Sequence, residues 1–202
     1  MTDWPDSGRA VRARRGKPRL PGADRDGGYG WISIALHWLA GVAIIVLLFA
    51  GDSIGTAGEP ARRIHTTIAS CAWLILAARI AWRMLEGHPP PASGQGRFSY
   101  GAGVAVHYAL LAGIALMLVS GPVAGWSSGG GIEVFDLHIP GASQRIPDVY
   151  AIAREAHIIG AVVLAAGTTA HIGGVLKHMF FDRDNLFDRI MVPPKRRPQT
   201  ST

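Results

Sequence analysis

The sequence is poor in charge and in cysteine, and both shortages narrow the classes of protein it can belong to. Charged residues make up 17% of the 202 positions and hydrophobic residues 49%, a balance that few soluble domains have. The single cysteine, Cys71, excludes an internal disulfide and a site built from several cysteines. Because Cys71 lies within an apolar block, we expect it to be a small buried residue.

Nucleotide-binding signatures are also missing. The chain contains no P-loop and no G-x-G-x-x-G fingerprint for a flavin or a dinucleotide. The sequence therefore shows no sign of a bound nucleotide or flavin.

What the chain does contain is four apolar blocks, each long enough to cross a bilayer, which takes about 20 residues. They span residues 31–50, 64–82, 103–124 and 157–176, and Arg79 is the one charged residue inside them. Strict alternation is absent and the blocks exceed the length of a barrel strand, so we expect helices. The sequence therefore predicts an all-α fold, an integral membrane four-helix bundle surrounded by lipid.

Basic residues gather at the two chain ends, and this sets the expected orientation. Seven Lys or Arg residues precede the first block and six follow from Lys177 onward. Four spans put both ends on one side of the membrane, and the positive-inside rule makes that side cytoplasmic. Basic clusters at the ends of apolar blocks suit a membrane surface rather than nucleic acid. We expect disordered basic segments at 1–28 and 193–202, flanking one domain at 29–192.

Four histidines fall at two depths in the predicted bundle. His65 and His157 open the second and fourth spans at the outer side, whereas His37 and His171 lie toward the cytoplasm. The 14 residues from His157 to His171 place both on one helix face, about 21 Å apart. Two pairs of facing imidazoles are what two low-spin b-type haems need. A lone intramembrane histidine is often a hydrogen bonder between helices, but four at matching depths on three helices are harder to explain that way.

Glycines accompany these histidines. Gly41, Gly160 and Gly167 lie on the same helix faces as the histidines near them. A planar macrocycle between helices needs such flat surfaces, although glycine is also common wherever membrane helices pack closely. His88 and His138 are expected to be ordinary loop residues.

These motifs, taken together, resemble those of the prokaryotic cytochrome b561 family of di-haem, four-helix membrane proteins. The resemblance covers about residues 29–192 and rests on "ISIALHWL", "RRIHTTIASCAWLILAARIAWR", "AVHYALLAGIALMLVSGPVAGW", "VFDLHIPG", "EAHIIGA" and "AHIGGVLKHMFFDRDNLFDRIM". It implies that His37 and His171 ligate the iron of an inner haem, that His65 and His157 ligate that of an outer haem, and that the third span carries no ligand. The long basic leader departs from the family's pattern.

The resemblance also implies a function, electron transfer through two b-type haems across a bacterial inner membrane, with quinone as a substrate at one face. Some members of the family oxidise superoxide at the outer face and reduce ubiquinone, which would make this chain a superoxide:quinone oxidoreductase. The alternative is a cytochrome subunit that passes electrons to a partner dehydrogenase or hydrogenase. A histidine-lined metal permease is a more distant alternative, because it would use carboxylates within its spans and the four blocks contain none.

Three arginines are candidates for the outer substrate site. Arg62 and Arg63 come shortly before His65, and Arg154 comes three residues before His157. Basic residues are unfavourable both at an outer membrane face and at a helix N-terminus. The three arginines are therefore candidates either to attract a small anion such as superoxide or to contact haem propionates.

Three other residues are candidates for a quinone site at the cytoplasmic end. Arg79 lies near the close of the second span, His107 in the cytoplasmic half of the third, and His178 at the close of the fourth. A quinone that is being reduced takes up protons, and a histidine is a suitable donor near neutral pH. The competing interpretation of His178 is a side chain that reaches toward the membrane surface.

Overall fold

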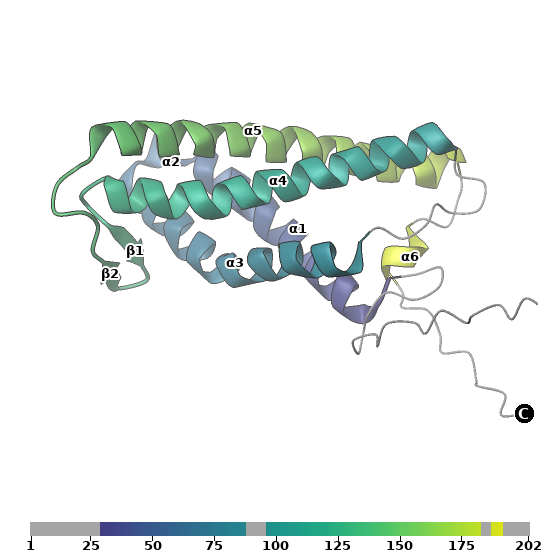
Figure 1. The fold of residues 1–202 in the computed structure, drawn as a ribbon, viewed down its shortest axis with the longest axis horizontal. Helices are drawn as coiled ribbons and strands as arrows, with labels where there is room; N and C mark the ends of the chain where they lie inside the picture. The colour runs from purple at the N-terminus through teal and green to yellow at the C-terminus, as the bar shows by residue number, and fades with distance from the viewer. Residues whose placement is uncertain (1–28, 88–95, 183–186, 192–202) are drawn as a thin grey trace, which may run out of the picture.

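Four long helices form the protein, as the sequence predicts (Figure 1). The computed structural model describes residues 29–87, 96–182 and 187–191, so His88 and the terminal segments 1–28 and 193–202 lie outside the described residues. The long helices are α1 (Trp31–Asp52), α3 (Glu59–Glu86), α4 (Arg97–Ser127) and α5 (Pro147–Lys177). The short α2 (Ile54–Ala57) follows α1, a π-helical turn η1 (His178–Asp182) continues α5, and α6 (Asp188–Met191) comes last.

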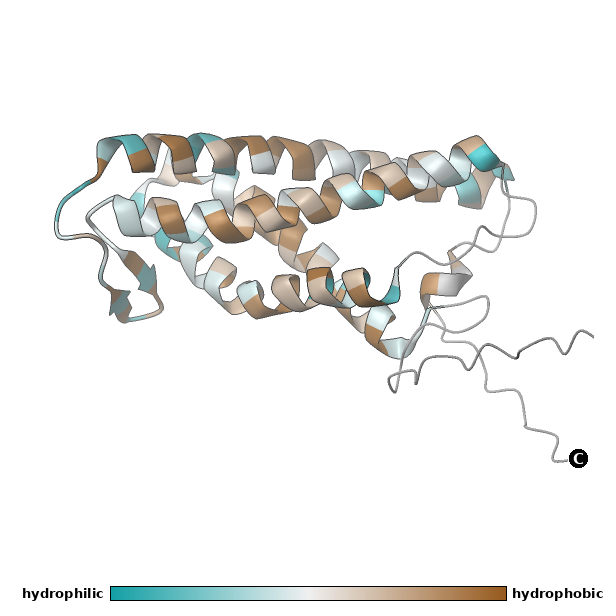
Figure 2. Cartoon of the chain, in the orientation of Figure 1, coloured by the Kyte–Doolittle hydropathy of each residue, from teal (hydrophilic) through white to brown (hydrophobic). Residues whose placement is uncertain are grey.

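All four helices are long and apolar enough to cross a membrane. The spanning segments are Trp31–Ala57, Glu59–Glu86, Arg97–Ser127 and Pro147–Asp182. A helix of 31 residues is about 46 Å long, whereas the hydrocarbon core of a bilayer is about 30 Å thick. The helices therefore continue beyond their apolar blocks as more polar turns, which Figure 2 shows at the ends of α4 and α5. His65 and His157 consequently lie about two and three turns inside α3 and α5 rather than at the helix starts.

A small β-hairpin closes one end of the bundle, and the sequence analysis did not predict it. Strands β1 (Ile132–Val134) and β2 (Leu137–Ile139) pair antiparallel, with Glu133 opposite His138. We call this end, which also holds His65 and His157, the hairpin end. The opposite end holds the start of α1, η1 and α6 (Figure 1), and we call it the terminal end.

The four helices pack as two pairs, α1 with α3 and α4 with α5, and the two pairs contact each other much less. Glycines bring α4 and α5 close together. A Cβ atom on Gly113 would lie 2.9 Å from Leu164 Cδ2, and one on Gly160 would lie 2.8 Å from Met117 Sδ. A Cβ atom on Gly167 would likewise lie 2.9 Å from a leucine of α4. Gly160 and Gly167 thus serve close helix packing, the second of the two explanations that the sequence left open.

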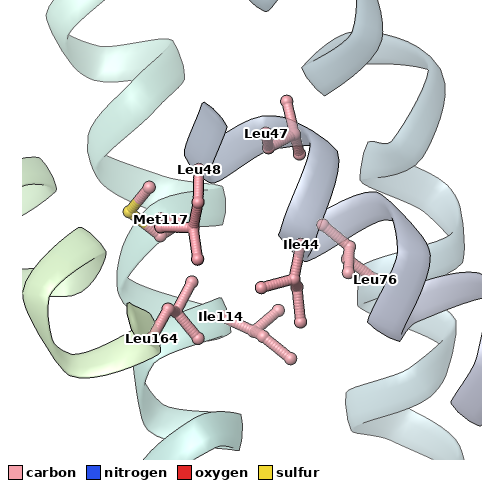
Figure 3. A pocket seen from close by; sticks show the side chains of 7 residues that line it. All are labelled: Ile44, Leu47, Leu48, Leu76, Ile114, Met117 and Leu164. Carbon is pink, nitrogen blue, oxygen red and sulfur yellow. The ribbon is translucent and has the colours of Figure 1, made fainter. Parts of the chain in front are cut away.

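An apolar core joins the two helix pairs at the middle of the bundle. Its buried members come from all four long helices: Ala40, Ile44, Ala72, Leu76, Ile114 and Leu164. A small cavity in this layer is lined by apolar side chains alone (Figure 3): Ile44, Leu47, Leu48, Leu76, Ile114, Met117 and Leu164.

The expectation of a buried Cys71 is wrong, because its side chain is exposed on α3. Its helix neighbour Leu74 is 73% exposed, and Phe49 of α1 is 75% exposed. In a membrane protein the outer surface of the bundle meets lipid, so apolar residues occupy both faces of a helix. An apolar neighbourhood in the sequence therefore does not establish that a residue points inward.

Candidate functional site

The four histidines expected at two depths form two pairs in space. At the terminal end, the ring centroids of His37 and His171 lie 5.8 Å apart, with the ring planes at 65°. At the hairpin end, the ring centroids of His65 and His157 lie 6.2 Å apart, with the planes at 80°. In each pair α5 supplies one histidine, and the partner comes from α1 or α3. Each pair of histidines therefore joins α5 to a helix of the other helix pair, α1 or α3.

These separations fit two axial imidazoles on opposite sides of one metal atom. An imidazole nitrogen binds a first-row transition metal at about 2 Å, which places the ring centres of a facing pair about 6 Å apart. Within the described residues, no group of three or more His, Cys, Asp or Glu side chains could hold a metal ion by itself. Two histidines are too few for a protein-built zinc site, but they are the complete protein ligand set of a low-spin b-type haem. The residues present thus fit the expected cofactor.

His171 has a second histidine beside it. The ring of His107, on α4, has its centroid 5.0 Å from that of His171, with a tilt of 54°. This separation is shorter than an axial pair requires, whereas the 5.8 Å between His37 and His171 is close to it. His37 is therefore the better partner for His171 across a metal, and His107 is a neighbour of the pair.

Small residues surround the histidine pair at the hairpin end. A Cβ atom on Gly51 would lie 3.4 Å from Cε1 of His65, and one on Gly121 would lie 3.2 Å from Cε1 of His157. Ser120, only 4% exposed, has its Oγ 3.0 Å from Nδ1 of His157. Gly51, Ser120 and Gly121 were not predicted from the sequence. A serine within an apolar block, at the depth of a candidate ligand, is the signal that could have identified Ser120.

Two arginines of α3 accompany the pair at the terminal end. Arg79 interacts electrostatically with His37 and with His171, and Arg83 interacts with His37. The guanidinium carbon of Arg83 also lies 5.5 Å from the centre of the Tyr29 ring, and Arg83 is only 5% exposed. The sequence analysis identified Arg79 but not Arg83, which lies one helical turn later. This end of the site therefore carries buried positive charge suited to an anionic group.

Open space remains next to His37. Nothing lies within 4 Å of the position that a Cβ atom on Gly41 would take, and Gly41 is one turn from His37 on the same helix face. Of the three glycines singled out in the sequence, Gly41 alone has the free surface that a planar cofactor needs.

The apolar core separates the two histidine pairs. Leu164 on α5 lies seven residues from His157 and seven from His171, so it stands about 10 Å along the helix from each. It is 4% exposed and borders the cavity in Figure 3. A layer without polar side chains offers water no hydrogen-bond partners between the two pairs.

A polar cluster built around His178 lies about two turns beyond His171 at the terminal end. Nε2 of His178 lies 3.2 Å from Oγ of Ser99 on α4, and its Nδ1 lies 2.9 Å from Oδ2 of Asp182. Nζ of Lys177 lies 2.5 Å from the same oxygen. His178 thus joins a hydroxyl on α4 to an ion pair at the end of α5, a connection that the sequence spacing did not reveal.

The three candidate arginines at the hairpin end differ in their contacts. Arg62 forms an ion pair with Glu59, at 2.6 Å. Arg63 donates to the carbonyl of Phe135 at 3.0 Å and pairs with Asp136 at 2.6 Å, so it fastens the hairpin to α3.

Arg154 differs from the other two. It is exposed, and no hydrogen bond or ion pair joins it to another described residue. It is therefore the arginine of this group that forms no ion pair with a described acidic residue.

Comparisons with known proteins agree with this architecture. A family model for prokaryotic cytochrome b561 matches residues 28–193. The chain is similar to the Escherichia coli (strain K12) protein named cytochrome b561 homolog 2. The two are 25% identical over 170 residues, which cover 81% of this chain and 90% of that protein. The chain therefore belongs to the prokaryotic cytochrome b561 family, membrane cytochromes in which b-type haem carries electrons across the bilayer.

Proposed function

We propose that the protein holds two b-type haems, one between His37 and His171 and one between His65 and His157. The observation that carries this proposal is the presence of two histidine pairs, with ring centroids 5.8 and 6.2 Å apart, at opposite ends of the bundle. Bound haem supplies a reversible one-electron couple between ferric and ferrous iron. The protein's part is to fix the imidazoles, to exclude water between the pairs and to place charge at the two ends.

The basic residues support one direction of the chain in the membrane. We place both termini in the cytoplasm of a bacterial cell and the hairpin end at the outer face of the inner membrane. The seven basic residues before α1 and the six from Lys177 onward support this orientation. The hairpin-end histidines then face the periplasm, and the pair of His37 and His171 faces the cytoplasm.

Superoxide and quinone are the substrates that we assign to the two ends. Two superoxide anions would each lose one electron at the hairpin end and leave as dioxygen. One quinone would gain these two electrons and two protons at the terminal end and leave as quinol. The exposed charge of Arg154 supports attraction of a small anion at the hairpin end. The alternative is a cytochrome subunit that exchanges electrons with a partner dehydrogenase or hydrogenase.

The cluster around His178 supports the quinone assignment. Its ring nitrogens contact Ser99 on one side and Asp182 on the other. The imidazole can release a proton to a quinone and regain one from water at this exposed end of the bundle. Arg79 and His107 lie closer to the histidine pair and are the remaining candidates for contact with the quinone.

The two-haem proposal is tested by removing the ligands one at a time. We expect His37→Ala and His171→Ala to remove one haem, and His65→Ala and His157→Ala to remove the other, so that haem per protein falls by about half in each variant. His107→Ala and His138→Ala are the matched controls and should keep full haem content. The measurement is a pyridine haemochrome assay on purified protein, with low-temperature spectra to identify which haem remains. Full haem content and unaltered low-spin spectra in all four ligand variants would overturn the assignment.

A further inference from the structure

Ser120 is a buried polar side chain in the middle of the hairpin-end site. It is 4% exposed, on a helix that is long and apolar enough to cross a membrane. A buried hydroxyl is costly without a partner, and the Oγ of Ser120 lies 3.0 Å from Nδ1 of His157 on the neighbouring helix. Of the four paired histidines, His157 alone hydrogen-bonds another side chain among the described residues.

The residue after Ser120 fixes which edge of the imidazole faces α4. A Cβ atom on Gly121 would lie 3.2 Å from Cε1 and 3.5 Å from Nδ1 of His157. The Nδ1–Cε1 edge of this ring therefore rests on Ser120 and Gly121. Nε2, the other nitrogen, is the one left to bind a metal.

The two histidines of this pair are held differently. The Cε1–Nδ1 edge of His65 packs against Gly51 on α1. A Cβ atom on Gly51 would lie 3.4 Å from Cε1 and 3.6 Å from Nδ1 of His65. Gly51 has no hydroxyl that could hydrogen-bond the ring. His157 has both a glycine and a serine. A ligating imidazole whose second nitrogen donates a hydrogen bond has a fixed tautomer and greater basicity toward the metal.

We propose that Ser120 is a positioning residue that accepts the Nδ1–H of His157, holds the ring plane and presents Nε2 to the haem iron at the hairpin end. This inference rests on the proposed function, because it requires that His65 and His157 hold a haem. A more basic imidazole stabilises ferric over ferrous iron, so the hydrogen bond lowers the reduction potential of this haem relative to the same site without it.

The test is Ser120→Ala in the purified full-length cytochrome. We expect the one-electron reduction equilibrium of one haem to shift about twofold to tenfold toward the ferrous form, the range of one ordinary hydrogen bond. A tenfold shift corresponds to about 59 mV for a one-electron couple. Potentiometric titration with optical detection measures both haems in one sample, and the haem between His37 and His171 serves as the internal reference. Electron paramagnetic resonance of the ferric protein should show a changed low-spin signal for the shifted haem only.

Two further variants separate a hydrogen bond from general damage. Ser127→Ala, on the same helix, removes a fully buried hydroxyl that donates to the Val123 carbonyl at 2.6 Å. Among the described residues this hydroxyl forms no hydrogen bond with a candidate ligand. It should leave both potentials unchanged. Ser120→Thr keeps the hydroxyl and should restore the potential of the unsubstituted protein. If Ser120→Ala loses the haem while Ser120→Thr retains it at its normal potential, the positioning role is also supported.

Two results would overturn the inference. One is an unchanged pair of potentials in Ser120→Ala with both haems present. The other is an equal shift in Ser120→Ala and Ser127→Ala. Neither result tests whether His65 and His157 are haem ligands. That part of the proposed function would fail on a different observation, full haem retention in His65→Ala and His157→Ala.

Discussion

Arg154 is the residue at which the proposed superoxide entry is most sharply testable. We expect Arg154→Gln to slow haem reduction by superoxide about twofold to fivefold at low ionic strength, because a local positive charge raises the encounter rate with a small anion. The rate should also depend less on salt than in the unsubstituted protein. Stopped-flow absorbance with a superoxide source measures the rate.

The matched control for Arg154→Gln is the double variant Glu59→Gln/Arg62→Gln, which removes an exposed ion pair without changing the net charge. Its reduction rate should stay normal. Loss of haem in Arg154→Gln, with a normal rate per remaining haem, would instead assign this arginine to a propionate. A normal rate with full haem would mean that Arg154 lies outside the entry site. Wild-type haem that does not respond to superoxide at all would favour a partner protein as donor.

His178 is the residue on which proton delivery to quinone depends in our proposal. We expect His178→Ala to slow the oxidation of reduced haem by added quinone about 100-fold or more, within the range usual for loss of a general acid. Haem content should stay full, since His178 belongs to neither histidine pair. His138→Ala is the control, because His138 is also paired with a carboxylate, Glu133 at 2.6 Å, but at the opposite end of the bundle. Unaltered oxidation by quinone in His178→Ala would rule out this placement.

At the scale of the helices, the close contact between α4 and α5 depends on glycines. We expect Gly113→Ala to destabilise the bundle by about 1 kcal/mol, because its Cβ would lie 2.9 Å from Cδ2 of the buried Leu164 and overpacking costs about 1–3 kcal/mol. Part of that cost is offset by the higher helix propensity of alanine. Thermal unfolding in detergent, followed by circular dichroism, measures the change.

Gly103→Ala is the control for this substitution. Gly103 lies on the same helix, and nothing is within 4 Å of its Cβ position, so alanine there should stabilise slightly or have no effect. Equal midpoints for the two variants would show that α5 does not pack on Gly113 as closely as described.

At the scale of the whole molecule, the orientation in the membrane can be measured directly. We expect green fluorescent protein fused after Thr202 to fluoresce and alkaline phosphatase at the same place to be inactive, because the basic ends favour the cytoplasm. Alkaline phosphatase inserted near Gly141, beyond the hairpin, should be active. An active phosphatase after Thr202 would reverse the proposed direction of electron transfer.

The whole bundle also explains why the two histidine pairs can work as separate sites. α5 carries one histidine of each pair, and the buried Leu164 lies midway between them. Because α1 with α3 and α4 with α5 form two tightly packed units, both histidine pairs lie where the units face each other.

The sequence by itself determined the four spans, their order and the depth of each histidine. Hydropathy and the rise of 1.5 Å per residue are local properties, so the 14 residues from His157 to His171 were enough to predict two layers. Local properties did not predict the hairpin, because its strands are only three residues long. The hairpin is held by contacts with α3, such as the hydrogen bond from Thr66 Oγ1 to the Glu133 carbonyl at 2.7 Å.

Only the tertiary structure decided how each helix is rotated about its axis. In lipid the outward face of a helix is as apolar as the inward face, so the pattern of hydrophobic residues could not show that Cys71 points outward. For the same reason it could not show that His107 stands beside His171, or that Ser120 meets His157. These contacts depend on which faces of α4 and α5 meet, and the glycines between the two helices set that geometry.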